Sequence, residues 1–128
     1  MRRSVGSGSR WEEAYGYSRA VRVGSVIKVS GTLAVARLGE ETVDGAYEQM
    51  LRCGEITLDA VTRLGGSVTD VVRTRMFITD PADADDVGRA HAALFADVRP
   101  AATMVVVAAL VEPAYKVELE LEAIVDTA

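Results

Sequence analysis

Residues 116–125, KVELELEAIV, alternate between apolar and charged side chains. Because successive side chains of a β-strand point to opposite faces of a sheet, this pattern predicts a strand with one apolar face and one charged face. The apolar face would carry Val117, Leu119, Leu121 and Ala123. The opposite face would carry Lys116, Glu118, Glu120 and Glu122. Three carboxylates in a row repel one another unless water, cations or the donors of a pocket receive them.

The length and composition are those of one globular domain. A chain of 128 residues falls in the usual size range of a compact domain, so we expect residues 1–128 to form one unit. Hydrophobic residues make up 49% and charged residues 26%, which argues against general disorder. The first ten residues, MRRSVGSGSR, are polar and rich in Gly and Ser, so we do not expect them to be firmly ordered.

The charge argues against nucleic-acid and membrane partners. With a net charge of -5 and a pI of about 4.9, the chain lacks the positive surface that non-specific nucleic-acid binding needs. The sequence contains no signal-peptide pattern and no apolar run of about 20 residues that could span a membrane, so we expect a cytoplasmic protein.

Cys53 and His91 are the only cysteine and the only histidine. A single cysteine cannot form an intramolecular disulfide, and one residue of each kind cannot build a His/Cys zinc site. Both fall on the apolar faces of predicted helices, where we expect them to be packed rather than catalytic. We therefore expect no metal catalysis, although these counts leave open a magnesium or calcium site built from carboxylates alone.

The first half of the chain predicts strands followed by a helix. Residues 17–31, YSRAVRVGSVIKVSG, are typical of two strands joined by a turn at Gly24-Ser25, and residues 32–41 of a third short strand. Apolar residues recur every three or four positions from Asp44 to Leu64, which predicts a helix that ends at Gly65-Gly66.

The second half predicts a strand, a helix and two more strands. Residues 68–80 alternate, with Val72, Met76 and Ile78 on one side and Val71, Arg73, Arg75 and Phe77 on the other. Asp80 and Pro81 would open the second helix, since Asp caps free N–H groups and Pro fits the first helical position. Strands at 102–110 and 116–125 follow. The order predicts an α+β fold, a single mixed β-sheet with two helices packed on one face.

Residues 102–110, ATMVVVAAL, are apolar on both faces, as expected of a strand that is covered on both sides. Two helices can cover only one side of such a sheet. We therefore expect another copy of the chain to cover the other side, which would place pockets between subunits.

Four segments together resemble the reactive intermediate deaminase (Rid) family, also called YjgF-like or L-PSP proteins. They are 16–32 (GYSRAVRVGSVIKVSGT), 64–80 (LGGSVTDVVRTRMFITD), 99–110 (RPAATMVVVAAL) and 117–125 (VELELEAIV). The resemblance implies a chorismate-mutase-like architecture assembled as a homotrimer, with the helices outside and three small-molecule pockets between subunits. It also implies cofactor-free hydrolysis of imines and enamines, such as 2-aminoacrylate, to a keto acid and ammonia.

The resemblance also assigns site residues. Glu120 matches the glutamate that positions the attacking water, which is reasonable because a carboxylate within hydrogen-bond reach can deprotonate water as it adds to a C=N carbon. The substrate-binding positions would be Tyr17, Ser30, Gly31, Ala102 and Thr103. Archetypal members read Pro-Ala-Arg where this chain reads Pro100, Ala101 and Ala102, so the arginine that clamps a substrate carboxylate is missing. Activity on amino-acid-derived imines is therefore in doubt.

Several alternatives remain open at the level of sequence. Glu120 is either the water-positioning carboxylate or one solvated carboxylate among three, while Glu118 and Glu122 should meet water, Arg73, Arg75 or a neighbouring subunit. The two arginines are either cross-strand partners of the glutamates or a substitute anion clamp. The protein is then a hydrolase of a small imine or enamine, or a ligand-binding or protein-modulating trimer without turnover. Endoribonuclease activity is a third reading, which the lack of a basic groove disfavours.

Overall fold

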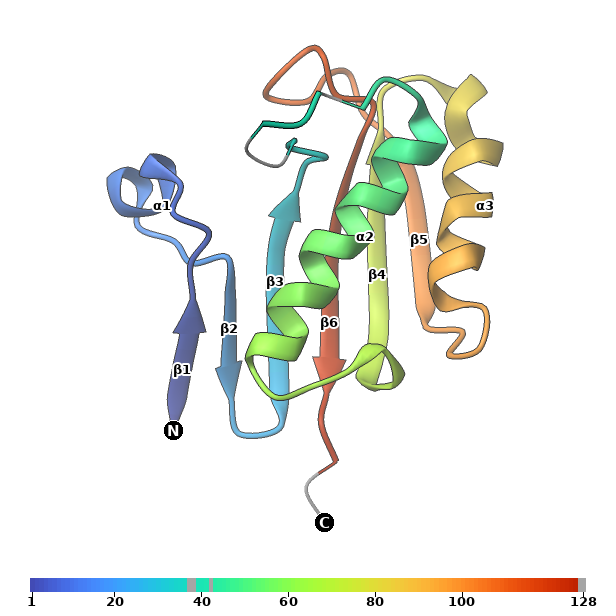
Figure 1. Ribbon diagram of the computed structural model, residues 1–128. Helices are drawn as coiled ribbons and strands as arrows, with labels where there is room; N and C mark the ends of the chain where they lie inside the picture. The colour runs from blue at the N-terminus through green and yellow to red at the C-terminus, as the bar shows by residue number, and fades with distance from the viewer. Residues whose placement is uncertain (37–38, 42, 127–128) are drawn as a thin grey trace.

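A computed structural model describes residues 1–36, 39–41 and 43–126, and it contains one six-stranded sheet in the order β1-β2-β3-β6-β4-β5 (Figure 1). The strands are β1 (Arg2–Val5), β2 (Ala20–Val23), β3 (Val26–Thr32), β4 (Val71–Ile78), β5 (Ala101–Val106) and β6 (Val117–Ile124). The helices are α1 (Arg10–Tyr15), α2 (Ala46–Arg63) and α3 (Ala84–Phe95). Only β4 and β5 pair in parallel, and α2 and α3 pack on the same face. The predicted α+β fold with a single mixed sheet is confirmed.

Strand β6 lies at the centre of the sheet and pairs antiparallel with both β3 and β4. Its apolar side chains are almost completely buried, with exposed fractions of 0–1%, and they face α2 and α3: Val117, Leu119, Leu121 and Ala123. Its glutamates lie on the helix-free face and are only partly buried. The alternation predicted from residues 116–125 is confirmed.

The segment before β2 is more ordered than its composition predicts. Residues 2–5 form β1, which pairs along its length with β2. Main-chain pairing needs no apolar side chain, and the arginines of this corner add a second anchor. Arg3 Nη2 and Arg22 Nη1 donate to the carbonyl oxygen of Leu64 at the end of α2, at 3.2 and 2.8 Å. Positive charge is favourable at this carbonyl end of a helix.

The hairpin turn at Gly24-Ser25 is confirmed, because it joins β2 directly to β3 and Gly24 has a φ of 59°. The third strand predicted within 32–41 is wrong for the described part of that segment, where β3 ends at Thr32. A hydrogen bond from Val35 N to Leu33 O (2.9 Å) closes a tight turn that leads the chain off the sheet. Positions 37 and 38 lie outside the described residues.

Strand β4 differs from the predicted alternation at its start. Val71 is 2% exposed and lies in the core, whereas Val72 is 42% exposed, although the sequence pattern placed them the other way round. The pairing of β4 with β6 shifts register between Val71 and Arg73, and this irregularity moves the first residue of the strand to the other face. From Arg73 to Ile78 the predicted faces hold.

Both helices begin and end near the predicted residues. The chain leaves α2 through Leu64 and Gly65, whose φ of 87° suits glycine, and Asp80 caps the turn before α3 by accepting a hydrogen bond from Ala82 N at 2.9 Å. His91 Nε2 lies 2.8 Å from Thr74 Oγ1, and burial lowers the pKa of the His91 imidazole. Cys53 is fully buried, and burial raises the pKa of its thiol to about 12. Both residues are therefore packed, as expected.

No helix among the described residues is both long enough and apolar enough to cross a lipid bilayer.

Helices α2 and α3 contact each other through Gly54, where an added Cβ would overlap the side chain of Leu94. We therefore predict that Gly54→Ala is less stable than wild type. Overpacking costs about 1–3 kcal/mol, which exceeds or cancels the gain of about 1 kcal/mol that Ala brings to a helix interior. Gly88→Ala in α3 is the matched control, because its Cβ would meet only Met104 Cε at 4.0 Å, and it should melt above wild type. Equal melting temperatures for the two variants would contradict this account of the helix contact.

Candidate functional site

The helix-free face of the sheet carries three cross-strand pairs between β4 and β6. The register pairs Phe77 with Glu118, Arg75 with Glu120 and Arg73 with Glu122. The same face continues into β5 and β3 through Thr103, opposite Arg75, and Lys28, opposite Glu122. The predicted clustering of the glutamates with arginines on one face is therefore correct, but the three carboxylates have different neighbours.

Glu122 is the most strongly paired of the three. Lys28 Nζ lies 2.8 Å from Glu122 Oε1, and Arg75 Nη1 lies 3.5 Å from the same oxygen. The hydrogen bond from Lys28, with the Arg75 charge in addition, lowers the pKa of Glu122. Because the pair lies at the surface, its contribution to stability is at most about 1 kcal/mol.

Glu120 shares the guanidinium of Arg75, whose Nη1 lies 3.5 Å from Glu120 Oε1. This confirms the interpretation of Arg75 as a cross-strand partner, and it leaves Arg75 engaged by two carboxylates. Arg73 behaves differently, because its Nη2 donates to Thr103 Oγ1 at 2.6 Å instead of to a glutamate. Neither arginine is placed as a free anion clamp.

Glu118 does not meet either arginine, so of the partners expected for it, water and a neighbouring subunit stay as predictions. Its register partner is Phe77, and its Oε2 lies 2.9 Å from the position that a Cβ on Gly31 would occupy. Within the described part of the chain, no hydrogen bond or ion pair reaches its carboxylate. Burial raises the pKa of Glu118, the charge of Arg19 opposes this effect, and the charge of Glu120 adds to it.

Ser30 and Gly31 are held by a network that starts at Arg19. Arg19 Nη2 donates to the carbonyl oxygens of Ser30 (2.7 Å) and Gly31 (2.6 Å), and Ser30 N donates to Arg19 O at 3.0 Å. Ser30 Oγ donates to Ser18 O at 2.7 Å. This part of β3 coincides with the register shift against β6 between Val29 and Thr32, so side-chain bonds replace the regular ladder there.

Arg19 is the site residue that the sequence interpretation missed. It follows Tyr17 and Ser18 directly and precedes the buried Ala20 at the start of β2. Its side chain bonds to backbone carbonyl oxygens, and no side-chain motif in the sequence indicates such contacts. Burial lowers its pKa, while the charges of Glu12, Tyr17 and Glu118 act in the opposite direction.

Tyr17 and Ser30 line the same hollow, which has a volume of about 590 Å³. Glu12, Glu13 and Lys28 also lie along its wall, so the hollow is bordered by both signs of charge. Glu120 is not among its lining residues, although the register shift of β3 places Ser30 and Gly31 next to the β6 segment that carries it. The structure therefore brings Tyr17 to Ser30 and leaves Glu120 on the adjacent part of the same face.

Ala102 lies on the opposite side of the sheet from Glu120. Its register partner is Thr74, which is buried beneath α3, whereas Thr103 faces Arg75 on the helix-free face. Strand β4 also separates β5 from β6. Within one subunit the strand of Ala102 is therefore not next to Glu120, because parallel pairing to β4 puts β5 at the far edge, and their proximity in a pocket between subunits stays a prediction.

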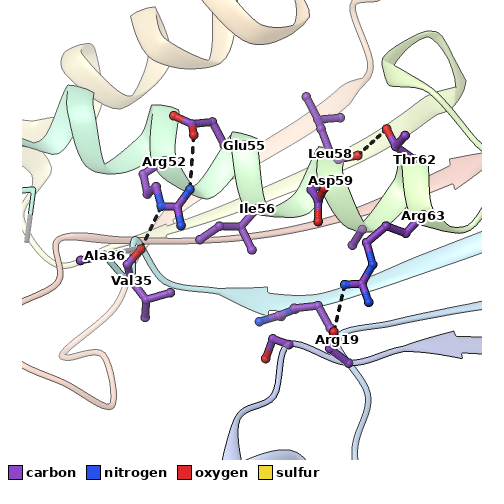
Figure 2. Close-up of a pocket in the computed structure, with 13 residues that line it drawn as sticks. Arg19, Val35, Ala36, Arg52, Glu55, Ile56, Leu58, Asp59, Thr62 and Arg63 are labelled. Atoms are coloured by element: carbon purple, nitrogen blue, oxygen red, sulfur yellow. Dashed lines mark hydrogen bonds and ion pairs between the residues drawn. The ribbon is translucent and has the colours of Figure 1, made fainter. Parts of the chain in front are cut away.

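A larger hollow of about 940 Å³ lies on the helix side, between α2 and the N-terminal segment (Figure 2). Figure 2 shows Arg52 bonded to Val35 O (2.9 Å) and to Glu55 (3.3 Å), while Arg63 Nη1 donates to Gly6 O at 2.9 Å. These bonds hold loop and N-terminal backbone against α2. Of the residues around Ser30, only Arg19 reaches this hollow, and none of the predicted site residues lines it.

Among the residues that the structure describes, no group of three or more His, Cys, Asp or Glu side chains is arranged to hold a metal ion.

The chain is an α+β protein. Its mixed sheet has two helices on one face and carries the glutamates of β6 on the other face. The sequence model of the family described as Endoribonuclease L-PSP matches residues 8–125, and the chain belongs to this family, which is also called YjgF or Rid. The expected family membership is confirmed.

Three similar proteins illustrate the relationship. The uncharacterized protein SCO2049 of Streptomyces coelicolor is 37% identical over 121 residues, which cover 94% of this chain and 90% of the relative. The RutC family protein y4sK of Sinorhizobium fredii is 35% identical over 106 residues, covering 81% and 82%. The crystal structure of Rv2704 from Mycobacterium tuberculosis, a member of the YjgF/YER057c/UK114 family, is 38% identical with a TM-score of 0.89, covering 98% of this chain and all of the other.

We predict that Arg19→Met lowers the free energy of unfolding by about 1–3 kcal/mol, because it removes the hydrogen bonds that the guanidinium donates to the carbonyl oxygens of Ser30 and Gly31. The measurement is chemical denaturation monitored by circular dichroism. Arg89→Met is the matched control, since Arg89 pairs with Asp85 and Asp86 and lies over the Tyr47 ring on the exposed surface of α3, where the loss of stability should be much smaller than for Arg19→Met. If the two variants lose equal stability, Arg19 is not the anchor of Ser30 and Gly31.

Proposed function

We propose that this protein hydrolyses a small imine or enamine, without a cofactor, in a pocket formed between copies of the chain. The observation that carries this proposal is the position of Glu120, whose carboxylate lies on the helix-free face of the sheet beside the Ser30–Gly31 segment, with Arg75 Nη1 at 3.5 Å. Membership of the L-PSP family supports the same reading.

The proposed reaction is the addition of water to a C=N carbon. Glu120 accepts a proton from the water as its oxygen bonds to the carbon of R₂C=NH₂⁺, and the resulting carbinolamine carries both the new C–O bond and the amine. Glu120 then returns its proton to the nitrogen, the C–N bond breaks with release of ammonia, and the hydroxyl group passes its proton to that ammonia as the C=O bond forms, so that R₂C=NH₂⁺ and H₂O become R₂C=O and NH₄⁺. Ser30, Gly31, Tyr17 and Thr103 are the proposed substrate contacts around this centre.

The proposed pocket needs more than one copy of the chain. Glu120 and Ala102 lie on opposite faces of the sheet, so both can approach one ligand only if they belong to different subunits. Apolar side chains also remain exposed at the sheet, including Val23, Ile124, Val105 and Val106, with exposed fractions between 41% and 52%. Burying such side chains against a second copy is favourable.

The first prediction for this pocket is a trimer in solution. Light scattering coupled to gel filtration should give three times the chain mass of 13.6 kDa at micromolar concentration. A mass of one chain would contradict both the trimer and the intersubunit pocket.

The second prediction separates Glu120 from Glu122. Glu120→Gln should lower turnover of a small imine by about 10²–10⁴-fold while melting near wild type, because a water-positioning carboxylate contributes that much to rate and little to stability. Glu122→Gln is the matched control and should keep turnover within a few-fold, since Glu122 serves Lys28 and Arg75. The assay generates the imine in situ from a neutral amino compound. Equal turnover in both variants would show that Glu120 is only a solvated carboxylate without a role in catalysis.

The third prediction concerns the missing arginine. Wild-type protein should hydrolyse 2-aminoacrylate weakly or not at all, and Ala102→Arg should increase that rate, because a guanidinium can bind and orient the substrate carboxylate where a methyl group cannot. The comparison is the rate of 2-aminoacrylate loss for the two proteins and for an arginine-containing relative. A wild-type rate equal to that of the relative would show that this chain needs no arginine there.

The second candidate function is a ligand-binding or protein-modulating trimer without turnover. Ala102 favours it, because the orienting clamp is lost while the proposed contacts at Tyr17 and Ser30 remain. Binding of a small ligand by a protein that shows no turnover with neutral or anionic imines would favour this function over hydrolysis. An endoribonuclease role fits less well, because the helix-free face carries three glutamates in one strand.

A further inference from the structure

Glu118 occupies an unusual place on the helix-free face. It lies between Phe77 of β4, its register partner, and Gly31 of β3, whose backbone its carboxylate covers. With Oε2 only 2.9 Å from the position of a Gly31 Cβ, any larger residue at position 31 would displace this carboxylate. Because residue 31 is a glycine, the Glu118 carboxylate has room to lie against the backbone next to Ser30.

The cations near this face are already engaged elsewhere. Arg75 lies between Glu120 and Glu122, and Lys28 bonds to Glu122. Arg19 is the cation whose charge acts most strongly on Glu118, but its Nη2 donates to the carbonyl oxygens of Ser30 and Gly31. In the described ranges of the chain, Glu118 is thus the one glutamate of β6 that no side-chain donor reaches.

A half-buried carboxylate without a donor is unfavourable in the empty protein and becomes favourable when a ligand supplies an N–H group. Burial already raises the pKa of Glu118, which is the response expected of a carboxyl group without a compensating partner. A ligand carboxylate would meet the opposite situation, since it would approach two carboxylates on one strand, those of Glu118 and Glu120.

We propose that Glu118 is the specificity-determining residue of this site, accepting hydrogen bonds from the nitrogen of a cationic or neutral imine or amine and rejecting ligands that carry a carboxylate. The proposal deepens the proposed function and rests on it for the location of the pocket. The proposal goes beyond the loss of the arginine. This chain lacks a group that attracts anions, and Glu118 would in addition repel them.

The substrate class follows from this arrangement. Protonated imines of simple aldehydes and ketones present two N–H donors and no negative charge, so they can bond to Glu118 while the C=N carbon faces Glu120. Imines of amino acids bear a carboxylate next to the reacting carbon, which Glu118 and Glu120 would repel.

The test is binding of three small probes of matched size: propylammonium, propanamide and propanoate. Wild-type protein should bind propylammonium and propanamide at least ~10-fold more tightly than propanoate, measured by NMR titration. The carboxylate of propanoate would lie a few ångströms from that of Glu118, and repulsion between like charges at that distance on a protein surface weakens binding by about this factor. Glu118→Gln should reduce the ratio of propanoate to propylammonium dissociation constants to within about three-fold, and Glu118→Lys should reverse it. Circular dichroism melting confirms that each variant is folded.

Glu122→Gln is the matched control, because it removes one carboxylate from the same strand face and should leave the selectivity ratio within about two-fold of wild type. Selectivity that is equal in Glu118→Gln and wild type overturns the proposal, as does a wild-type preference for propanoate or the absence of binding by all three probes. Binding with the expected selectivity but no imine turnover would instead contradict the hydrolase proposal and leave the role of Glu118 intact.

Discussion

The strict alternation of β6 is the constraint on which the rest of the structure depends. This strand is paired on both edges, so its apolar residues are fixed against α2 and α3, and its glutamates are fixed on the opposite face. A register slip of one residue would move three carboxylates into the core and expose Leu119 and Leu121, which makes the arrangement strongly specified. The acidic face is therefore a direct consequence of how the centre of the sheet is buried.

The three glutamates share a strand face but not an environment. Their neighbours on β3 and β4 change from Lys28 and Arg75 at Glu122, through Arg75 alone at Glu120, to Gly31 and Phe77 at Glu118. The face thus passes from a solvated ion-pair network to a half-buried carboxylate without a donor. Such a gradient can separate the tasks of stabilising the sheet, positioning water and selecting a ligand, which are the roles proposed for the three residues.

Local sequence patterns predicted the parts of the fold that depend on local physics. The apolar face of β6, the turn at Gly24 and the end of α2 at Gly65 follow from alternation, helical periodicity and the conformational freedom of glycine. The parts that were missed depend on pairing between distant segments. Strand β1 exists because it pairs with β2, and the register shift at Val71 appears only when β4 meets β6.

The candidate site was predictable to a similar extent. Tyr17 and Ser30, which the family resemblance selected, line one hollow, and the alternation of residues 116–125 predicted the glutamates on the open sheet face. The resemblance did not indicate that Ala102 faces the helix side, because that depends on the parallel register between β4 and β5. It also missed Arg19, since two hydrogen bonds to backbone carbonyls leave no side-chain motif in the sequence.

The most direct test of this account is a measurement of the carboxyl pKa values of Glu118 and Glu122 by NMR titration of ¹³C-labelled protein. Glu118 should titrate above the ordinary range of glutamate because burial disfavours its charged form, and Glu122 should titrate below that range because Lys28 and Arg75 stabilise its charged form. Equal pKa values for the two residues, or the reverse order, would contradict the claim that one strand face holds carboxylates in distinct environments.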